Sequence, residues 1–355
     1  MRERLLEGLL WFVERPSVTG GEKLLCDDLE TRLNKIPGWE VQRVSNNLVV
    51  RREGQDTARK QIVFAGHLDT VPEPEGGLPV RVEGERIYGR GASDMKAGDA
   101  VMLALLEDFS WDGSWAEPAF VFYEREEGPY AENGLEVVFA GSPWVLDADF
   151  VLVLEPTAGA LEVGCVGSAH IEVTFRGRSC HSARPWQGEN AITAAGEFLT
   201  KLHQRQVEEV IVEGMTFYEV LVPTIARGGR ARNVVPDEFW IHINYRFAPG
   251  KDRGDVREVF EGLLEGSSAE YEITEYAPSG PVELDNPLLQ KLIDLGLEVR
   301  PKQAWTDVAR FAGRGVAAAN FGPGRPSQAH QEAEYAELPL LEECYERLRS
   351  FLEHN

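Results

Sequence analysis

Hydrophobic runs and helical spacings divide the chain into regular elements. Every position from Ile62 to Ala65 is apolar, which is typical of a strand buried on both faces. Residues 119–123 and 150–154 contain runs of the same kind. Leucines recur at helical spacing over residues 2–14 and 22–33, which predicts two amphipathic helices. This mixture of buried strands and helices indicates an α/β fold.

Metal-capable side chains follow these hydrophobic runs. Taken singly, each has an ordinary interpretation: a His-x-Asp triplet is more often a polar strand end, and an acid before a helix is more often a cap. The pattern recurs, however, after the three runs above and after a fourth run at 316–320. Ligands of open α/β sheets bind at the carboxyl ends of the strands. The candidates are His67, Asp69, Asp94, Glu126, Glu127, Glu155 and His330.

The chemistry of these candidates points to a divalent cation. Two histidines and several carboxylates without cysteine form a nitrogen and oxygen site suited to zinc or a similar ion. One tetrahedral ion cannot use so many anionic groups. Two ions about 3.5 to 4 Å apart, with one bridging carboxylate, would use them all.

A segment of different character interrupts the catalytic pattern. Residues 168–281 predict the order βαββαβ, which is the ferredoxin-like unit. An insert of this size, with candidate site residues on both sides, suggests a second domain that acts as a lid. We therefore expect a metal-binding catalytic domain formed by residues 1–167 and 282–355, and a lid and dimerisation domain between them.

Composition narrows the functional classes. The 355 residues carry a formal charge of −23, which argues against nucleic acid or anionic membrane surfaces as partners. No apolar stretch is long enough to span a bilayer and no signal peptide is evident, so we expect a cytoplasmic protein. The four cysteines lack C-x-x-C spacing and suggest neither a disulfide framework nor a thiolate zinc site.

The ordered motifs GHLDTVP, GRGASDMKAG, EREEG, LEPT and GPG followed by AH resemble those of a known family. This is the zinc-dependent family of aminoacylases, carboxypeptidases and deacylases, and the resemblance covers nearly the whole chain. It implies a mixed-sheet catalytic domain of the zinc exopeptidase type and two Zn²⁺ ions, with Co²⁺ as a possible substitute. By this resemblance, His67, Asp94 and Glu155 hold one zinc, Asp94, Glu127 and His330 hold the other, and Asp94 bridges them.

The resemblance also implies roles for three further residues. Asp69 would orient His67 and raise its basicity. Glu126 would be the general base that takes a proton from the attacking water and passes it to the leaving amine. His181, in RGRSCHSARP, matches the lid histidine that reaches the partner's active site in dimeric relatives. A homodimer is therefore expected.

Residues for substrate recognition are matched less specifically. Asn233 and Arg246 match lid positions that contact the anionic end of the substrate in relatives, and Thr306 and Arg184 are further candidates. Arg310 has an equally good interpretation as a structural salt bridge. Many relatives have Thr-Ser-Asp-x-Arg where this chain has Thr-Asp-Val-Ala-Arg, so the acid has moved by one place in this loop.

Within the family, the segment WTDVARFAGRGVAAANFGPG most resembles actinobacterial-type succinyl-diaminopimelate desuccinylases. The implied reaction is hydrolysis of N-succinyl-LL-2,6-diaminopimelate to succinate and LL-2,6-diaminopimelate, a step in lysine and diaminopimelate biosynthesis. Three alternatives remain open: an acetylornithine deacetylase or dipeptidase with the same metal site, a two-metal phosphoesterase, and a binding protein that lost catalysis. The phosphoesterase lacks support because no Gly-rich phosphate-binding loop opens a helix here. The presence of Glu126 with a complete ligand set argues against a binding protein without catalysis.

Overall fold

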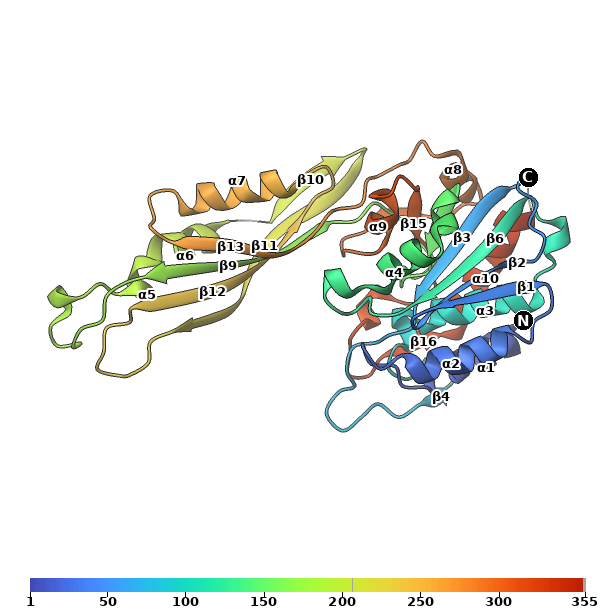
Figure 1. Cartoon of the computed structure of the whole chain (residues 1–355), viewed down its shortest axis with the longest axis horizontal. Coiled ribbons are helices and arrows are strands. Elements are labelled where there is room, and N and C mark those ends of the chain that lie inside the picture. The colour runs from blue at the N-terminus through green and yellow to red at the C-terminus, as the bar shows by residue number, and fades with distance from the viewer. Residues whose placement is uncertain (206, 354–355) are drawn as a thin grey trace. The chain divides into compact units, whose positions relative to one another are not determined.

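The computed structural model describes residues 1–205 and 207–353. The chain forms two compact units, which are described separately (Figure 1). Unit 1 contains Met1–Gly164, Glu283–Arg300 and the described chain from Thr306 onward. Unit 2 contains Cys165–Val282 together with Pro301–Trp305. The short piece Pro301–Trp305 comes from a region that the sequence had assigned to the catalytic domain.

A mixed eight-stranded sheet forms the centre of unit 1, in the order β1-β2-β6-β3-β7-β15-β8-β14. Its four middle strands, β6, β3, β7 and β15, are parallel to one another, whereas the remaining recorded pairings are antiparallel. The bounds are β1 (Trp39–Val44), β2 (Asn47–Arg52), β3 (Lys60–His67), β6 (Ala116–Tyr123), β7 (Phe150–Val153), β8 (Leu161–Val163), β14 (Val299–Pro301) and β15 (Ala318–Asn320). A small sheet joins β4 (Arg81–Glu83), β5 (Arg86–Tyr88) and β16 (Tyr335–Glu337).

Helices pack against this sheet and complete the core of unit 1. Helix α3 contacts β3 and also packs against α1 and α10, and every position from Ala97 to Leu106 is buried. Helix α4 contacts β2 and β6, and α9 contacts β7 and β15. The bounds are α1 (Arg2–Val13), α2 (Lys23–Leu33), α3 (Ala97–Asp108), α4 (Gly134–Gly141), α8 (Pro287–Asp294), α9 (Val308–Ala312) and α10 (Leu338–Glu353).

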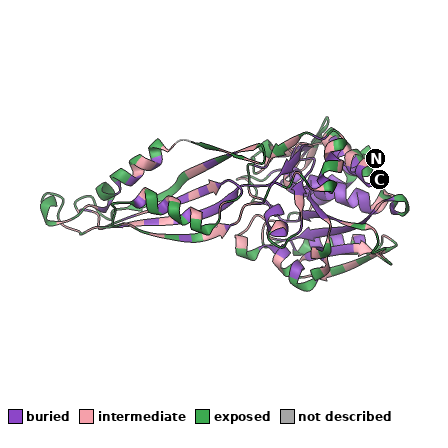
Figure 2. Ribbon diagram, turned by 90° about the horizontal axis from the view of Figure 1, so that it is seen from above, coloured by how far each residue is buried: buried purple, intermediate pink, exposed green. Residues whose placement is uncertain are grey.

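Unit 2 is an antiparallel sheet with helices, in the order β10-β11-β12-β9-β13. Strands β11, β12, β9 and β13 with their helices reproduce the predicted βαββαβ order, and β10 is an additional strand paired with β11. Alternate residues of β9 and β12 face a core that includes Phe198 and Phe260, which produces the striped burial in Figure 2. The bounds are β9 (Gly167–Arg176), α5 (Ala191–Ala194), α6 (Gly196–Gln204), β10 (Glu208–Val212), β11 (Met215–Gly228), β12 (Glu238–Phe247), α7 (Arg253–Leu264) and β13 (Glu270–Ala277).

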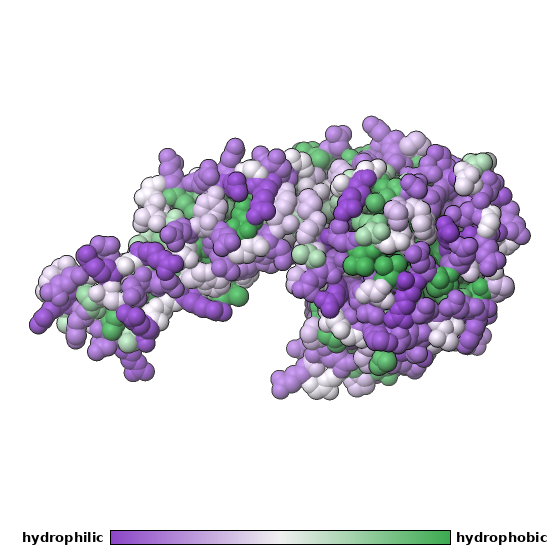
Figure 3. Space-filling model, in the orientation of Figure 1, coloured by the Kyte–Doolittle hydropathy of each residue, from purple (hydrophilic) through white to green (hydrophobic). Residues whose placement is uncertain are grey.

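The surface is largely polar. On the face drawn in Figure 3, hydrophilic residues predominate on both units, and hydrophobic areas are small and separate. Within residues 1–205 and 207–353, no helix is both long enough and apolar enough to cross a bilayer.

Candidate metal centre

Parallel strands deliver the first ligands to one edge of the sheet in unit 1. His67 is the last residue of β3, and it lies beside Tyr123, the last residue of β6. Because β7 runs parallel to β3 as well, Glu155 follows its strand at the same edge. Both His67 and Glu155 are at least 95% buried, so their side chains face the interior of the edge and not bulk solvent.

Asp94 lies between the two histidines. His67 Nε2 is 3.3 Å from Asp94 Oδ1 and 3.8 Å from Glu155 Oε1. His330 Nε2 is 3.5 Å from the other oxygen, Asp94 Oδ2, and 2.8 Å from Glu127 Oε1. Two groups of three candidate ligands therefore share one carboxylate through its two different oxygens. These groups are His67, Asp94 and Glu155, and Asp94, Glu127 and His330. Ligand atoms of His67, Glu126 and Glu127 also lie within 4.8 Å of one another, without Asp94.

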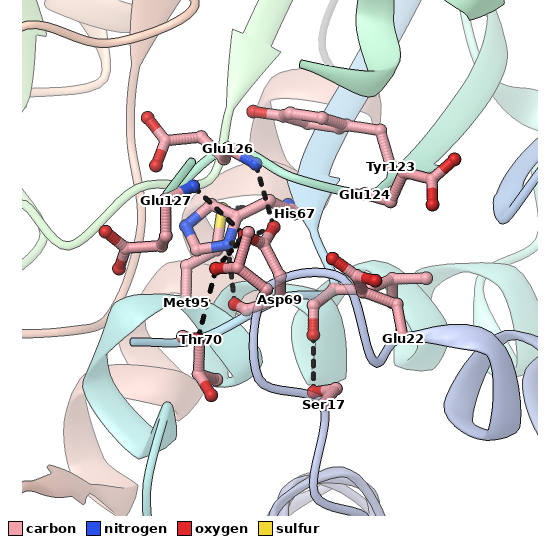
Figure 4. A network of polar contacts seen from close by, with 12 residues as sticks. Ser17, Glu22, His67, Asp69, Thr70, Met95, Tyr123, Glu124, Glu126 and Glu127 are labelled. Carbon is pink, nitrogen blue, oxygen red and sulfur yellow. Dashed lines mark hydrogen bonds and ion pairs between the residues drawn. The ribbon is translucent and has the colours of Figure 1, made fainter. Parts of the chain in front are cut away.

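The carboxylate of Asp69 holds the loop that carries two of the acids (Figure 4). Its Oδ1 accepts a hydrogen bond from the N–H of Glu126 at 2.9 Å, and its Oδ2 accepts one from the N–H of Glu127 at 3.0 Å. The Thr19 hydroxyl donates a further bond to Oδ2 at 2.9 Å. His67 Nδ1 lies 2.9 Å from the main-chain oxygen of Asp69 but 3.7 Å from its carboxylate. The direct orientation of His67 thus comes from the backbone of residue 69.

Burial and neighbouring charges shift the pKa values of two groups in the site. Burial lowers the pKa of His67, but the carboxylates of Asp94, Glu126 and Glu155 outweigh it and raise that pKa well above its usual value. Burial also raises the pKa of Glu126 well above the ordinary range, and the nearby charge of Glu155 adds to the effect. The positive charge of His67 opposes this rise in the pKa of Glu126.

Close backbone contacts explain the GPG motif. A Cβ atom at Gly322 would lie 2.3 Å from the main-chain oxygens of Leu154 and Glu155, and a Cβ at Gly324 would lie 2.1 Å from the main-chain oxygen of Ser93. Only glycine permits such an approach. The motif therefore allows the segments that carry Glu155 and Asp94 to pack tightly against the loop that leads to His330.

Left-handed backbone conformations occur next to the candidate ligands. The described non-glycine residues with positive φ are Ser45, Arg125, Ala158, Glu213 and His330, and two of them, Arg125 with φ = 61° and His330 with φ = 62°, lie at the site. Such residues cost roughly 1 kcal/mol or more and persist only where their surroundings impose them, commonly at functional sites. Here one conformation directly precedes Glu126, and the other belongs to a candidate ligand itself.

Four other predicted residues belong to unit 2. His181 and Asn233 lie on adjacent loops: His181 forms an isolated bridge with Val234, and Ser182 N–H donates to Asn233 O at 2.9 Å. Arg184 is exposed in the same turn, where its N–H donates to His181 O at 2.8 Å. Arg246 is half-buried near the far end of β12, and this burial lowers its pKa.

The loop after residue 305 is largely held inside unit 1. Thr306 is buried there. Arg310 donates to Asp307 Oδ1 at 2.7 Å and to Glu136 Oε1 at 3.1 Å, and its side chain is 1% exposed. Asp307 also accepts a hydrogen bond from the Tyr123 hydroxyl at 2.8 Å. These contacts favour the structural interpretation of Arg310 over a role in substrate binding.

Sequence reasoning missed the residues that position the site through backbone contacts. Thr19 bonds Asp69, and the buried carboxylate of Glu334 accepts hydrogen bonds from the turn that carries Asp94. Only Glu334 could have been noticed in the sequence, as an acid four residues after the candidate ligand His330. The remaining histidines of unit 2 stand apart: His170 and His242 hydrogen bond to each other at 3.0 Å, and His203 is exposed.

The fold and the site together define a class: an α/β protein with an added ferredoxin-like unit and a histidine and carboxylate centre able to hold two cations. The family described as Peptidase family M20/M25/M40 matches residues 63–354. The chain belongs to this family.

Relatives and solved structures resemble the chain over almost its whole length. The chain is 36% identical to the succinyl-diaminopimelate desuccinylase of Corynebacterium glutamicum over 348 residues, covering 96% of this chain and 94% of that protein. The solved structure of aminopeptidase PepT from Bacillus cereus has a TM-score of 0.81 and 20% identity, covering 99% and 98% of the two chains. The YXEP protein of Bacillus subtilis, described as a dinuclear metal binding peptidase, has a TM-score of 0.71 and 18% identity, covering 99% of this chain and 97% of that chain. At these identities the structures show a shared fold.

Replacement of Asp69 by asparagine tests the loop contact. We expect Asp69→Asn to lower catalytic activity by about 10- to 100-fold, as for other groups that support metal ligands. The reason is that an amide has one oxygen where the carboxylate has two, so either Glu126 N–H or Glu127 N–H loses its acceptor. Steady-state kinetics on protein with an unchanged circular dichroism spectrum measures the effect.

Asp149→Asn is the matched control for this substitution. Asp149 also accepts a backbone hydrogen bond, from Gln61 N–H at 2.9 Å, but at the opposite end of β3. We expect its activity to stay near that of the unmodified protein. Equal activity for both variants would contradict the role assigned to Asp69.

Proposed function

We propose that this protein is a dinuclear zinc amidohydrolase that cleaves N-succinyl-LL-2,6-diaminopimelate to succinate and LL-2,6-diaminopimelate. The observation that carries the proposal is the shared carboxylate of Asp94, which lies 3.3 Å from one histidine and 3.5 Å from the other through separate oxygens. The desuccinylase from Corynebacterium glutamicum, 36% identical over 96% of this chain, supports the choice of substrate.

The donor set fits two zinc ions. Each group offers one imidazole nitrogen and two carboxylates, and their ligand atoms lie within 4.8 Å of one another. Nitrogen and oxygen donors without thiolates suit Zn²⁺, and Co²⁺ accepts similar ligands. When bound, two such ions polarise an amide carbonyl and lower the pKa of water toward neutrality.

Glu126 performs the proton transfers in this proposal. Its carboxylate accepts a proton from water as the water oxygen forms a bond to the succinyl carbonyl carbon. The carbon–nitrogen bond then breaks, and Glu126 returns the proton to the departing amine nitrogen. The bonds from Glu126 N–H and Glu127 N–H to Asp69 fix the backbone of the two adjacent acids, of which one moves protons and the other serves as a ligand.

Recognition of the anionic substrate falls to cationic and amide groups. Arginine suits carboxylates because its guanidinium binds them with two parallel hydrogen bonds. Arg246 and the group formed by His181 and Asn233 are the candidates in unit 2, with Arg184 beside the latter. Thr306 is the candidate in unit 1.

The geometry within unit 2 supports a homodimer. Glu238, at the start of β12, pairs with Arg176, and the loops with His181 and Asn233 lie beyond this end. Arg246 lies eight residues along the strand from Glu238, which corresponds to about 25 Å. One small substrate cannot contact both groups of a single copy. If both act in catalysis, they serve different sites, and two copies must assemble.

A panel of substrates tests the reaction. With added Zn²⁺ or Co²⁺, we expect N-succinyl-LL-2,6-diaminopimelate to give the highest kcat/KM, because its several carboxylates match the cationic groups. N-acetylornithine, dipeptides and a phosphate ester complete the panel, and a chelator should abolish activity. A preference for N-acetylornithine or a dipeptide would replace our substrate within the family, and phosphate release would indicate a phosphoesterase.

Replacement of Glu126 by glutamine tests its role as a base. We expect Glu126→Gln to lower kcat by at least 10²-fold, because the amide cannot accept the proton of the attacking water. The content of zinc, measured by elemental analysis, should not change. Asp94→Ala is the contrasting control, because it should lose metal as well as activity. A kcat near that of the unmodified enzyme would remove Glu126 from this role.

Mixing of two inactive variants tests the dimer. His181→Ala and Glu126→Gln should each be nearly inactive alone. Random exchange of subunits would produce half heterodimers with one intact site of two, so activity should recover to about a quarter of the unmodified value. A variant carrying both substitutions on one chain, mixed with either single variant, should give no recovery. Activity equal to the mean of the separate variants would refute sites that are shared between copies.

A further inference from the structure

Glu334 is a buried acid that no step of the proposed reaction uses. Its exposed fraction is 1%, and it lies four residues after the candidate ligand His330. Carboxylates are rarely buried to this extent without strong partners. Its contacts therefore indicate what it contributes.

Four N–H groups surround the carboxylate of Glu334. Oε1 accepts from the backbone N–H of Ser93 at 2.9 Å and from that of Asp94 at 3.1 Å. Oε2 accepts from the backbone N–H of Gly91 at 2.9 Å and from Arg90 Nη1 at 2.9 Å. A carboxylate has about four acceptor positions, so these donors occupy all of them. Glu334 consequently has no free lone pair for a metal ion and is not a candidate ligand.

Three of these donors belong to the turn that presents Asp94. The hydrogen bond from the N–H of Asp94 fixes the backbone of that residue. The hydrogen bonds from Gly91 N–H and Ser93 N–H fix the turn before it. Both oxygens of Asp94 must point in different directions to reach His67 and His330. A rotation of this turn would move both oxygens at once, so the turn has to be rigid.

The same contacts tie this turn to the segment that carries His330. Arg90 Nη1 also donates to Gln331 O at 3.2 Å, and Gly89 N–H donates to Glu334 O at 3.2 Å. Arg90 is itself only 7% exposed. All of these bonds run from donors in the segment 89–94 to acceptors in the segment 330–334, and each segment carries one ligand of the second group.

We propose that Glu334 is a positioning residue that fixes Asp94 relative to His330, and thereby sets the affinity of the cation position that these two residues share with Glu127. This inference rests on the proposed two-metal centre. Groups that hold metal ligands in place typically change metal affinity by about 10- to 100-fold when they are altered. The effect should be larger for the second group, because both segments that Glu334 joins contribute a ligand to it, whereas only Asp94 contributes to the first.

Glu334→Gln is the principal test, since it preserves the shape of the side chain. The amide nitrogen cannot accept a hydrogen bond, so two of the four N–H donors would face another N–H group. Glu332→Gln is the matched control, because Glu332 is exposed in the same segment and the change in charge is identical. The full-length protein is freed of metal and titrated with Co²⁺ in competition with a chelating dye.

We expect the unmodified protein and Glu332→Gln to bind two Co²⁺ ions with the same affinities and the same visible absorption spectrum. In Glu334→Gln, the dissociation constant of one ion should rise about 10- to 100-fold and the spectrum should change. If folded Glu334→Gln keeps both affinities and the spectrum, the inference is wrong and Glu334 only stabilises the fold. If the unmodified protein binds no metal, the proposed function fails first.

Glu334→Asp keeps the test decisive if the glutamine variant does not fold. Aspartate retains the charge and both oxygens but is shorter by one methylene, so it can satisfy only part of the turn. We expect the dissociation constant of one Co²⁺ ion to rise relative to the unmodified protein and to Glu332→Gln, and the visible spectrum to change. Affinity and spectrum equal to those of the unmodified protein would refute the inference.

Discussion

The rest of the site depends on one electrostatic constraint: several carboxylates must lie together at a protected sheet edge without repelling one another apart. Asp69, Asp94, Glu126, Glu127 and Glu155 all place carboxyl groups there. Such a cluster is stable only where hydrogen bonds and opposite charges compensate for lost hydration. Backbone N–H groups compensate Asp69, and the histidines lie against Asp94, Glu127 and Glu155. The binding of cations would complete the compensation and couple metal affinity to folding.

The fold meets this constraint because the carboxyl ends of rigid, parallel strands lie next to one another. Parallel strands place their carboxyl ends at one edge, so ligands distant in the sequence need little further ordering. The loops must then be fixed individually. Asp69 fixes the loop with Glu126 and Glu127, and the glycines of the GPG motif allow the loop before His330 to approach Glu155 and Ser93 closely.

The elements predicted from sequence were those with long, clear patterns. Continuous hydrophobic runs identified β3, β6 and β7, because strands buried on both faces have no polar positions. Three-residue strands such as β8 and β14 have no period to recognise, and they exist because neighbouring strands pair with them. Helix α10 was not predicted, although Leu341, Leu348 and neighbouring apolar residues carry a helical spacing that would have indicated it. The fold class was confirmed, including the ferredoxin-like order of unit 2.

The candidate ligands could be found from sequence because their chemistry resides in the side chain. The structure brings His67, Asp94, Glu127, Glu155 and His330 into two groups. The groups that orient them could not be found in this way, because every residue except proline carries a backbone N–H and no letter of the sequence marks the one that is used. The buried side-chain contacts of Asp307 with Tyr123 and Arg310 were missed for a different reason: they join segments whose proximity only the folded chain defines.

The ion pair of Asp307 and Arg310 limits which parts of the chain can change among relatives. The guanidinium of Arg310 is already engaged by the buried carboxylate of Asp307 and by the partly exposed one of Glu136, and Asp307 ties it to the strand that ends beside His67. Substitutions in this loop would break its contacts with the catalytic unit. We therefore expect few changes of sequence there among relatives. The loop of unit 2 that carries His181 and Arg184 is exposed, so its residues can change without disturbing the core of unit 1.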